Sequence, residues 1–269
     1  MVQQSSLGVA GTLWEGEALA SYRSTFGMSA MTQPLTEWKV LPHGRLTQID
    51  DNILTVEGEI PMPLAKLPRQ MTVVRLRDGR LVIFNGVALD EGEMRRLEEF
   101  GTPTFLVVPN GHHRLDAHIW KQRYPQLRVI APAGARSQVE KVVPVDATGV
   151  DFNDPDVKFA TVAGTGEGEA ALEVRGSSGT TLILNDVIGN IRNTSGFGGF
   201  FLRLMGFAGE DPHIPVPVKL AMIKDKPAAA AQLQRWAALP SLTRVLVSHG
   251  STIDRDPSGT LRKLAGSLG

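Results

Sequence analysis

Short apolar runs separated by turn residues predict that the ordered part of the chain opens with strands. The runs 53–56, 71–76 and 81–84 are rich in β-branched residues, which favour strands. Asp78 and Gly79 stand between the last two runs, and an Asp-Gly pair in that position is a strong hairpin signal. We therefore expect an antiparallel opening to the sheet.

After these runs, the pattern predicts that helices and strands alternate. Asp90 can cap a helix that runs to about Phe100, because Glu93 stands at the capping-box position. A buried strand over 104–108 follows and ends at Pro109. By the same reasoning, helices are expected over 116–124 and 227–236, and strands over 127–130, 157–162, 171–174, 181–184 and 243–247. Two β-rich halves, each finished by helices, predict an α/β fold, a four-layer αββα sandwich.

The first residues do not share this periodicity. Residues 1–35 mix Ser, Gly, Gln and Thr with scattered apolar residues, so we expect a loosely ordered N-terminal extension before a single domain over 36–269. Met28 and Met31 lie within the extension, and either is a candidate for the true start. The extension lacks the basic start and continuous apolar core of a secretory signal.

Composition narrows the classes of partner and site. The 28 basic and 28 acidic residues balance, so nothing favours binding to nucleic acid or to an anionic membrane. No apolar stretch reaches the roughly 20 residues that a membrane span requires. The chain has no cysteine, which excludes thiolate metal ligands and agrees with a reducing compartment. We expect a cytoplasmic protein that acts on a small molecule and binds any metal through His, Asp, Glu or water.

Three of the predicted strands end in residues that can bind a metal ion. These are His112 and His113 after the run 104–108, Asp186 after 181–184, and His249 after 243–247. Polar residues at the carboxyl ends of strands meet at one edge of an α/β sheet, where such proteins place their chemistry. We therefore expect one site at which Asn110, Asp186 and His249 lie together.

The order of these features resembles the metallo-β-lactamase superfamily over roughly residues 45 to 255. Within it, the chain is similar to a poorly characterised branch of domains of unknown function whose loop reads Pro-Asn-x-x-His, followed by Trp and Tyr-Pro. Here these are Pro109-Asn110-Gly111-His112-His113, Trp120 and Tyr124-Pro125. The resemblance implies the αββα sandwich and a metal-dependent hydrolase.

The chain departs from the superfamily's metal-binding motif. When His-x-His-x-Asp-His is laid on residues 110–115, only its second histidine is kept, as His112. Asn110 replaces the first histidine, and Arg114-Leu115 replaces the Asp-His pair that serves a second metal. The next family histidine is expected around 163–166, where none occurs. The superfamily's Asp-x-Gly turn is also weakened, to Asn85-Gly86.

The residues that remain imply a reduced metal site. The resemblance implies that His112, Asp186 and His249 hold one Zn²⁺ or Fe²⁺ with an open position for water. His113, Asp116 or His118 could substitute for a lost ligand, because another loop path would turn one of them inward. Asp116 is also placed to cap the next helix, and His118 to pack on it or face solvent.

The sequence leaves two functions open. The first is a hydrolase of an ester, lactone, amide or phosphoester, in which Asn110 or His113 contacts the substrate or the metal-bound water. The apolar segment 197–207 would then cover the pocket. The alternative is a metal-free, non-catalytic member that binds a small ligand or regulates a partner.

Overall fold

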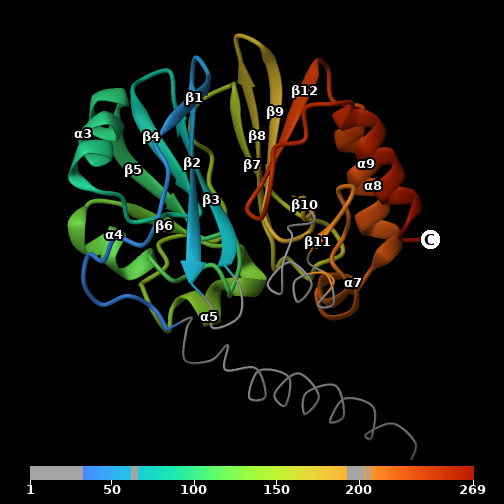
Figure 1. Ribbon diagram of the computed structural model, residues 1–269, viewed down its shortest axis with the longest axis horizontal. Helices are drawn as coiled ribbons and strands as arrows, with labels where there is room; N and C mark the ends of the chain where they lie inside the picture. Colours follow the sequence, from blue (N-terminus) through green and yellow to red (C-terminus); the bar gives the residue numbers. More distant parts are fainter. Residues whose placement is uncertain (1–32, 62–65, 193–202, 204–205, 207) are drawn as a thin grey trace, which may run out of the picture. The chain divides into compact units, whose positions relative to one another are not determined.

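The computed structural model describes residues 33–61, 66–192, 203, 206 and 208–269. The part from Pro34 to Gly269 forms one compact unit. Two mixed sheets face each other and helices cover their outer faces (Figure 1). This confirms the predicted αββα sandwich. None of the helices in the described ranges is long and apolar enough to cross a membrane.

The first sheet has its six strands in chain order. These are β1 (Thr47–Asp50), β2 (Ile53–Pro61), β3 (Lys66–Arg75), β4 (Arg80–Phe84), β5 (Thr102–Val107) and β6 (Arg128–Ile130). Strands β1 to β4 pair antiparallel, and Asp78-Gly79 forms the predicted turn between β3 and β4, with Gly79 at a φ of 85°. Strands β4, β5 and β6 are parallel, because helices α3 (Glu91–Phe100) and α4 (Ala117–Arg123) carry the chain back between them.

The second sheet has the order β12-β9-β8-β7. Its strands are β7 (Val157–Thr161), β8 (Ala170–Gly176), β9 (Gly179–Leu184) and β12 (Leu242–Val247). Strand β12 runs parallel to β9, since helix α8 (Lys226–Ala237) lies between them in the chain. The parallel pairing brings the ends of β9 and β12 side by side.

The sequence pattern did not predict the remaining elements of the described chain. They are η1 (Ala133–Ala135), α5 (Arg136–Val139), the parallel pair β10 (Ile191–Arg192) and β11 (Ala208–Gly209), α7 (Val216–Ala221) and α9 (Pro257–Gly266).

Three apolar clusters fill the spaces between the layers. The central cluster lies between the sheets, where Phe84 and Phe105 of the first sheet pack with Leu172 and Leu246 of the second. One outer cluster joins the first sheet to α3, α4 and α5, and the other joins the second sheet to α7, α8 and α9. Burial on both faces therefore holds each sheet in place.

The first predicted helix begins as expected, but its capping pattern differs. The Asp90 carboxylate accepts hydrogen bonds from the backbone of Gly92 and Glu93 at 2.8 and 3.0 Å. Glu93 does not return a bond to the Asp90 N–H, because its carboxylate is buried and accepts from the Leu46 N–H at 2.8 Å. The Asp90 N–H donates to His43 Nε2 at 3.1 Å instead.

A buried ion pair joins the first sheet to the start of α4. The Arg69 guanidinium on β3 contacts the Asp116 carboxylate, and their side chains are 5% and 1% exposed. Asp116 also accepts from the Ala88 N–H at 3.0 Å. Asp116 stands at the N-cap position of α4, as the sequence suggested, yet its side chain makes no capping bond because Arg69 and Ala88 engage it.

We expect Asp116→Asn to lower the free energy of unfolding by about 3 kcal/mol, because removing one partner of a buried pair leaves an uncompensated charge. Asp211→Asn is the matched control, since Asp211 and Lys263 are both more than 70% exposed and such pairs contribute at most about 1 kcal/mol. Urea denaturation of both variants measures the difference. Equal losses would show that the Arg69–Asp116 pair contributes no more than a surface pair.

Candidate metal centre

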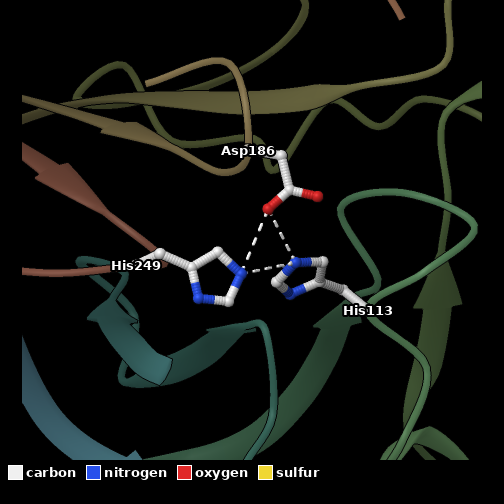
Figure 2. Close-up of side chains that lie close together, drawn as sticks. All are labelled: His113, Asp186 and His249. Carbon is white, nitrogen blue, oxygen red and sulfur yellow. Dashed lines mark hydrogen bonds and ion pairs between the residues drawn. The ribbon is translucent and has the colours of Figure 1, made fainter. Parts of the chain in front are cut away.

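Three side chains from separate loops converge on one point. Figure 2 shows the imidazole rings of His113 and His249 turned toward the carboxylate of Asp186. Asp186 Oδ1 lies 2.9 Å from His113 Nε2 and 3.2 Å from His249 Nε2, and the two Nε2 atoms are 3.2 Å apart. The side chains are 10 to 15% exposed, so the group lies just below the surface.

The ends of three strands bring these residues together. Asp186 follows β9 and His249 follows β12, and these strands are parallel neighbours. His113 lies in the loop after β5, in the other sheet. In that loop the Asn110 side-chain oxygen accepts from the N–H groups of His112 and His113 at 2.8 and 3.0 Å, which forms a tight turn. The turn directs His113 toward Asp186.

The protein fixes the protonation pattern of both imidazole rings. His249 Nδ1 lies 2.7 Å from the carbonyl oxygen of Pro68, which can only accept, so Nδ1 carries the hydrogen. His113 Nδ1 lies 2.9 Å from Asn85 Oδ1. The Asn85 amide donates from Nδ2 to the Gln70 carbonyl at 2.8 Å, so its Oδ1 is also an acceptor. Each neutral ring therefore presents the lone pair of its Nε2 to Asp186.

Three acceptor atoms that face one another require a positive charge between them. Two imidazole lone pairs and a carboxylate oxygen repel unless a proton or a metal ion lies among them. Burial acts to raise the pKa of Asp186, but interactions with His113 and then His249 outweigh it and hold that pKa well below its usual value. Burial acts to lower the pKa of His249, and the hydrogen bond and charge of Asp186 outweigh it, so that this pKa is raised.

The distances among the three atoms fit a metal ion. Ligand atoms about 2.0 to 2.1 Å from a tetrahedral ion lie about 3.3 Å apart, and neighbouring ligands of a six-coordinate ion lie about 3.0 Å apart. The two separations of 3.2 Å fall between these values, and the separation of 2.9 Å lies just below the shorter one. Hydrogen bonds from the outer ring nitrogens to Pro68 and Asn85 are the kind of support that metal-binding histidines receive.

A second buried carboxylate lies behind Asp186. Glu169 is fully buried, and its Oε1 accepts from the Asp186 N–H at 2.6 Å. The Asn110 amide donates to Glu169 Oε2 at 2.9 Å and to Asp186 Oδ2 at 2.7 Å. Burial and then the charge of Asp186 raise the pKa of Glu169 well above its usual value, against the lowering effect of these hydrogen bonds.

The structure brings together most of the residues that the sequence singled out. Asn110, Asp186 and His249 lie at one edge as expected, but His113 joins Asp186 and His249 where the aligned motif placed His112. His112 is exposed, because the turn capped by Asn110 directs the next residue inward.

The other candidates have different surroundings. The Asp116 carboxylate is engaged by Arg69 and Ala88, and His118 is partly buried on α4, outside the group. Asn110 is 1% exposed, and both ends of its amide are bonded within the protein. The segment 197–207 lies outside the described residues except for positions 203 and 206.

Sequence reasoning did not identify Glu169 or the role of Asn85. Glu169 is an acidic residue directly before the apolar start of β8, Ala170-Ala171, and this is the signal that could have marked it as buried. Asn85 stood out only as a departure from a family turn. Its φ of 59° lies in the left-handed region that Asn enters more easily than most residues.

Comparisons with known proteins agree with this architecture. No protein-family model and no curated protein matches the chain. Among solved structures, the metallo-β-lactamase FIM-1 from Pseudomonas aeruginosa, in its mono-zinc form, is 12% identical with a TM-score of 0.55, and the match covers 85% of this chain and 97% of that one. The DIM-1 metallo-β-lactamase exposed to ceftazidime is 14% identical with a TM-score of 0.58, covering 86% and 100%. Another DIM-1 structure is 13% identical with a TM-score of 0.56, covering 86% and 100%. At these identities the likeness concerns the fold, and the chain is thereby shown to have the metallo-β-lactamase fold.

Proposed function

We propose that this protein is a metal-dependent hydrolase with a single-ion centre held by His113, Asp186 and His249. The observation that carries the proposal is the convergence of three acceptor atoms at 2.9 to 3.2 Å, with both imidazole rings fixed as Nε2 ligands. Two nitrogens and one carboxylate oxygen suit Zn²⁺ or Fe²⁺ and leave a position for water. His113 thus takes the role that the motif assigned to His112.

The chemistry of the donor set supports hydrolysis of a small molecule. An ion bound by three protein ligands lowers the pKa of a bound water to about 7 and polarises an ester, lactone, amide or phosphoester oxygen. The chain's part is to hold the three ligand atoms at fixed positions. Pro68 and Asn85 hold the two imidazole rings, and the Asn110 amide holds the Asp186 carboxylate.

Two contacts favour one ion over two. The second oxygen of Asp186 accepts from the Asn110 amide, so it is already engaged. Arg114, which stands where the family has an acidic ligand of the second metal, donates to the Gln138 carbonyl at 2.5 Å. Arg114 has no acceptor atom to offer another cation, and one lone pair of Asp186 Oδ2 is already used. The FIM-1 structure in its mono-zinc form is a precedent for one ion in this fold.

The alternative is a metal-free module that binds a small ligand. One observation favours it: a proton can take the place of the cation, because Asp186 and a protonated His249 form an ion pair at 3.2 Å. The two functions differ in whether the site holds a metal ion, so metal analysis separates them.

We expect wild-type protein purified without a chelator or a His-tag to hold about one Zn²⁺ or Fe²⁺ per chain. His113→Ala and His249→Ala should each lower the metal content and any esterase, lactonase or phosphodiesterase activity at least 100-fold, because a three-ligand site loses one of its donors. His118→Ala and His112→Ala are the matched controls and should change neither. Elemental analysis of the five proteins measures the metal content, and assays of the same proteins measure the activity.

Two results would contradict this assignment. Retained metal in His113→Ala together with loss in His112→Ala would return the ligand role to His112. A wild-type protein that binds no Zn²⁺, Fe²⁺ or Mn²⁺ at micromolar concentration would favour the ligand-binding module.

The pH dependence of thermal stability gives a second test. In the metal-free protein the raised pKa of His249 contributes stability that is fully present below its ordinary value of 6.5, and this stability is lost as the pH rises through the folded value. Metal binding has the opposite dependence, since the imidazole ligands must be deprotonated. The gain in melting temperature on adding Zn²⁺ should therefore grow between about pH 6 and pH 8, and His249→Ala should abolish it. A gain that is independent of pH, or that persists in His249→Ala, would place the ion elsewhere.

A further inference from the structure

We infer that Glu169 is a positioning residue that sets the orientation of the Asp186 carboxylate, acting through the Asn110 amide and the Asp186 backbone. The inference deepens the proposed function and rests on it for its metal-binding readout. Glu169 is fully buried, and its carboxylate accepts hydrogen bonds from the Asn110 amide and from the Asp186 backbone N–H, the two groups through which it positions the Asp186 carboxylate.

The orientation of the Asn110 amide is determined by its oxygen. Oδ1 accepts from two backbone N–H groups, those of His112 and His113, and an amide nitrogen could not replace it there. Nδ2 must therefore face the opposite way, toward the carboxylates. Its two hydrogens are used separately, one on Glu169 Oε2 at 2.9 Å and the other on Asp186 Oδ2 at 2.7 Å.

Glu169 itself is held on both of its oxygens and through its backbone. Oε1 accepts from the Asp186 N–H at 2.6 Å. The Glu169 carbonyl accepts from Val162 at 2.9 Å, and the next N–H, of Ala170, donates to the Pro109 carbonyl at 2.8 Å. Pro109 directly precedes Asn110. Neighbouring backbone and side-chain hydrogen bonds therefore join the loop after β5 to the start of β8.

These contacts close a ring of hydrogen bonds around Asp186. Glu169 fixes both the backbone N–H of Asp186 and the amide that binds Asp186 Oδ2. With Oδ2 engaged, the carboxylate can turn only Oδ1 toward His113 and His249, where it lies 2.9 and 3.2 Å from their Nε2 atoms. The ring thus makes Asp186 a ligand through one oxygen, and it makes Glu169 necessary for that geometry.

Glu169→Gln tests the ring of hydrogen bonds, because glutamine has nearly the same side-chain shape as glutamate. The new amide can keep an oxygen on the Asp186 N–H, but its NH₂ group then faces the NH₂ group of Asn110, donor against donor, and one of the two must turn away. Glu169→Asp is the second variant, because it keeps the carboxyl group but is too short by one methylene to reach both partners. Glu173→Gln is the control, since Glu173 accepts from Trp236 Nε1 at 2.8 Å and does not contact the ring.

The measurement is the Zn²⁺ dissociation constant by competition with a chromophoric chelator, together with the visible spectrum of the Co²⁺ form. Glu169→Gln and Glu169→Asp should bind Zn²⁺ about 10 to 100-fold more weakly, the loss typical of residues that orient metal ligands. Their Co²⁺ spectra should shift, because the carboxylate ligand has moved. Glu173→Gln should match wild type in both.

Crystal structures of metal-free wild type and Glu169→Gln give a readout that needs no metal. The Asp186 carboxylate should rotate away from Asn110 in the variant. An unmoved carboxylate, or a Co²⁺ spectrum and affinity equal to wild type, overturns the positioning role while leaving the metal centre intact. A wild-type protein that is unable to bind a metal ion overturns the proposed function instead. The rotation of the Asp186 carboxylate in the crystal structures then decides the positioning role alone.

Discussion

A carboxylate that is largely removed from water, with two imidazole lone pairs turned toward it, is the constraint on which the candidate site depends. Asp186 stays ionised there only if a neighbouring imidazole is protonated or a metal ion binds, because an isolated buried charge is costly. The surrounding groups fix the position of that positive charge. Pro68 and Asn85 hold the imidazole rings of His249 and His113 by their Nδ1 atoms, and Asn110 binds Oδ2 of Asp186. These contacts make the group of His113, Asp186 and His249 a candidate centre for a positive charge.

The sandwich positions this centre by simple topology. Parallel pairing of β9 and β12 puts Asp186 and His249 side by side, and packing of the two sheets brings the loop after β5 against them. The apolar core between the sheets is therefore also what sets the separation of the ligands. Burial and the positive charge of Arg69, which is buried in its ion pair with Asp116, act to lower the pKa of His249, and the hydrogen bond and charge of Asp186 outweigh them. The structural ion pair and the site are in this way electrostatically linked.

The sequence predicted the features that follow from runs of apolar residues, and it missed those that depend on the hydrogen bonds of a single turn. Apolar runs and the Asp-Gly turn predicted both sheets, and strand ends predicted Asp186 and His249, because parallel strands end at a common edge. The motif alignment favoured His112 over His113, since a side-chain hydrogen bond from Asn110 decides which one turns inward and no periodicity reports it. Glu169 was missed for a similar reason: its partners are 59 residues away at Asn110 and 17 away at Asp186.

The hydrogen bond from His249 to the Pro68 carbonyl crosses from the second sheet to the first. A chain in which the two halves have folded but not yet docked has no acceptor there, and His249 is free to exchange between its two neutral tautomers. Docking selects the tautomer that offers Nε2. The grouping of His113, Asp186 and His249 is therefore complete only when the two sheets pack together, so a variant that loosens the sheet packing would lose this arrangement before it loses its secondary structure.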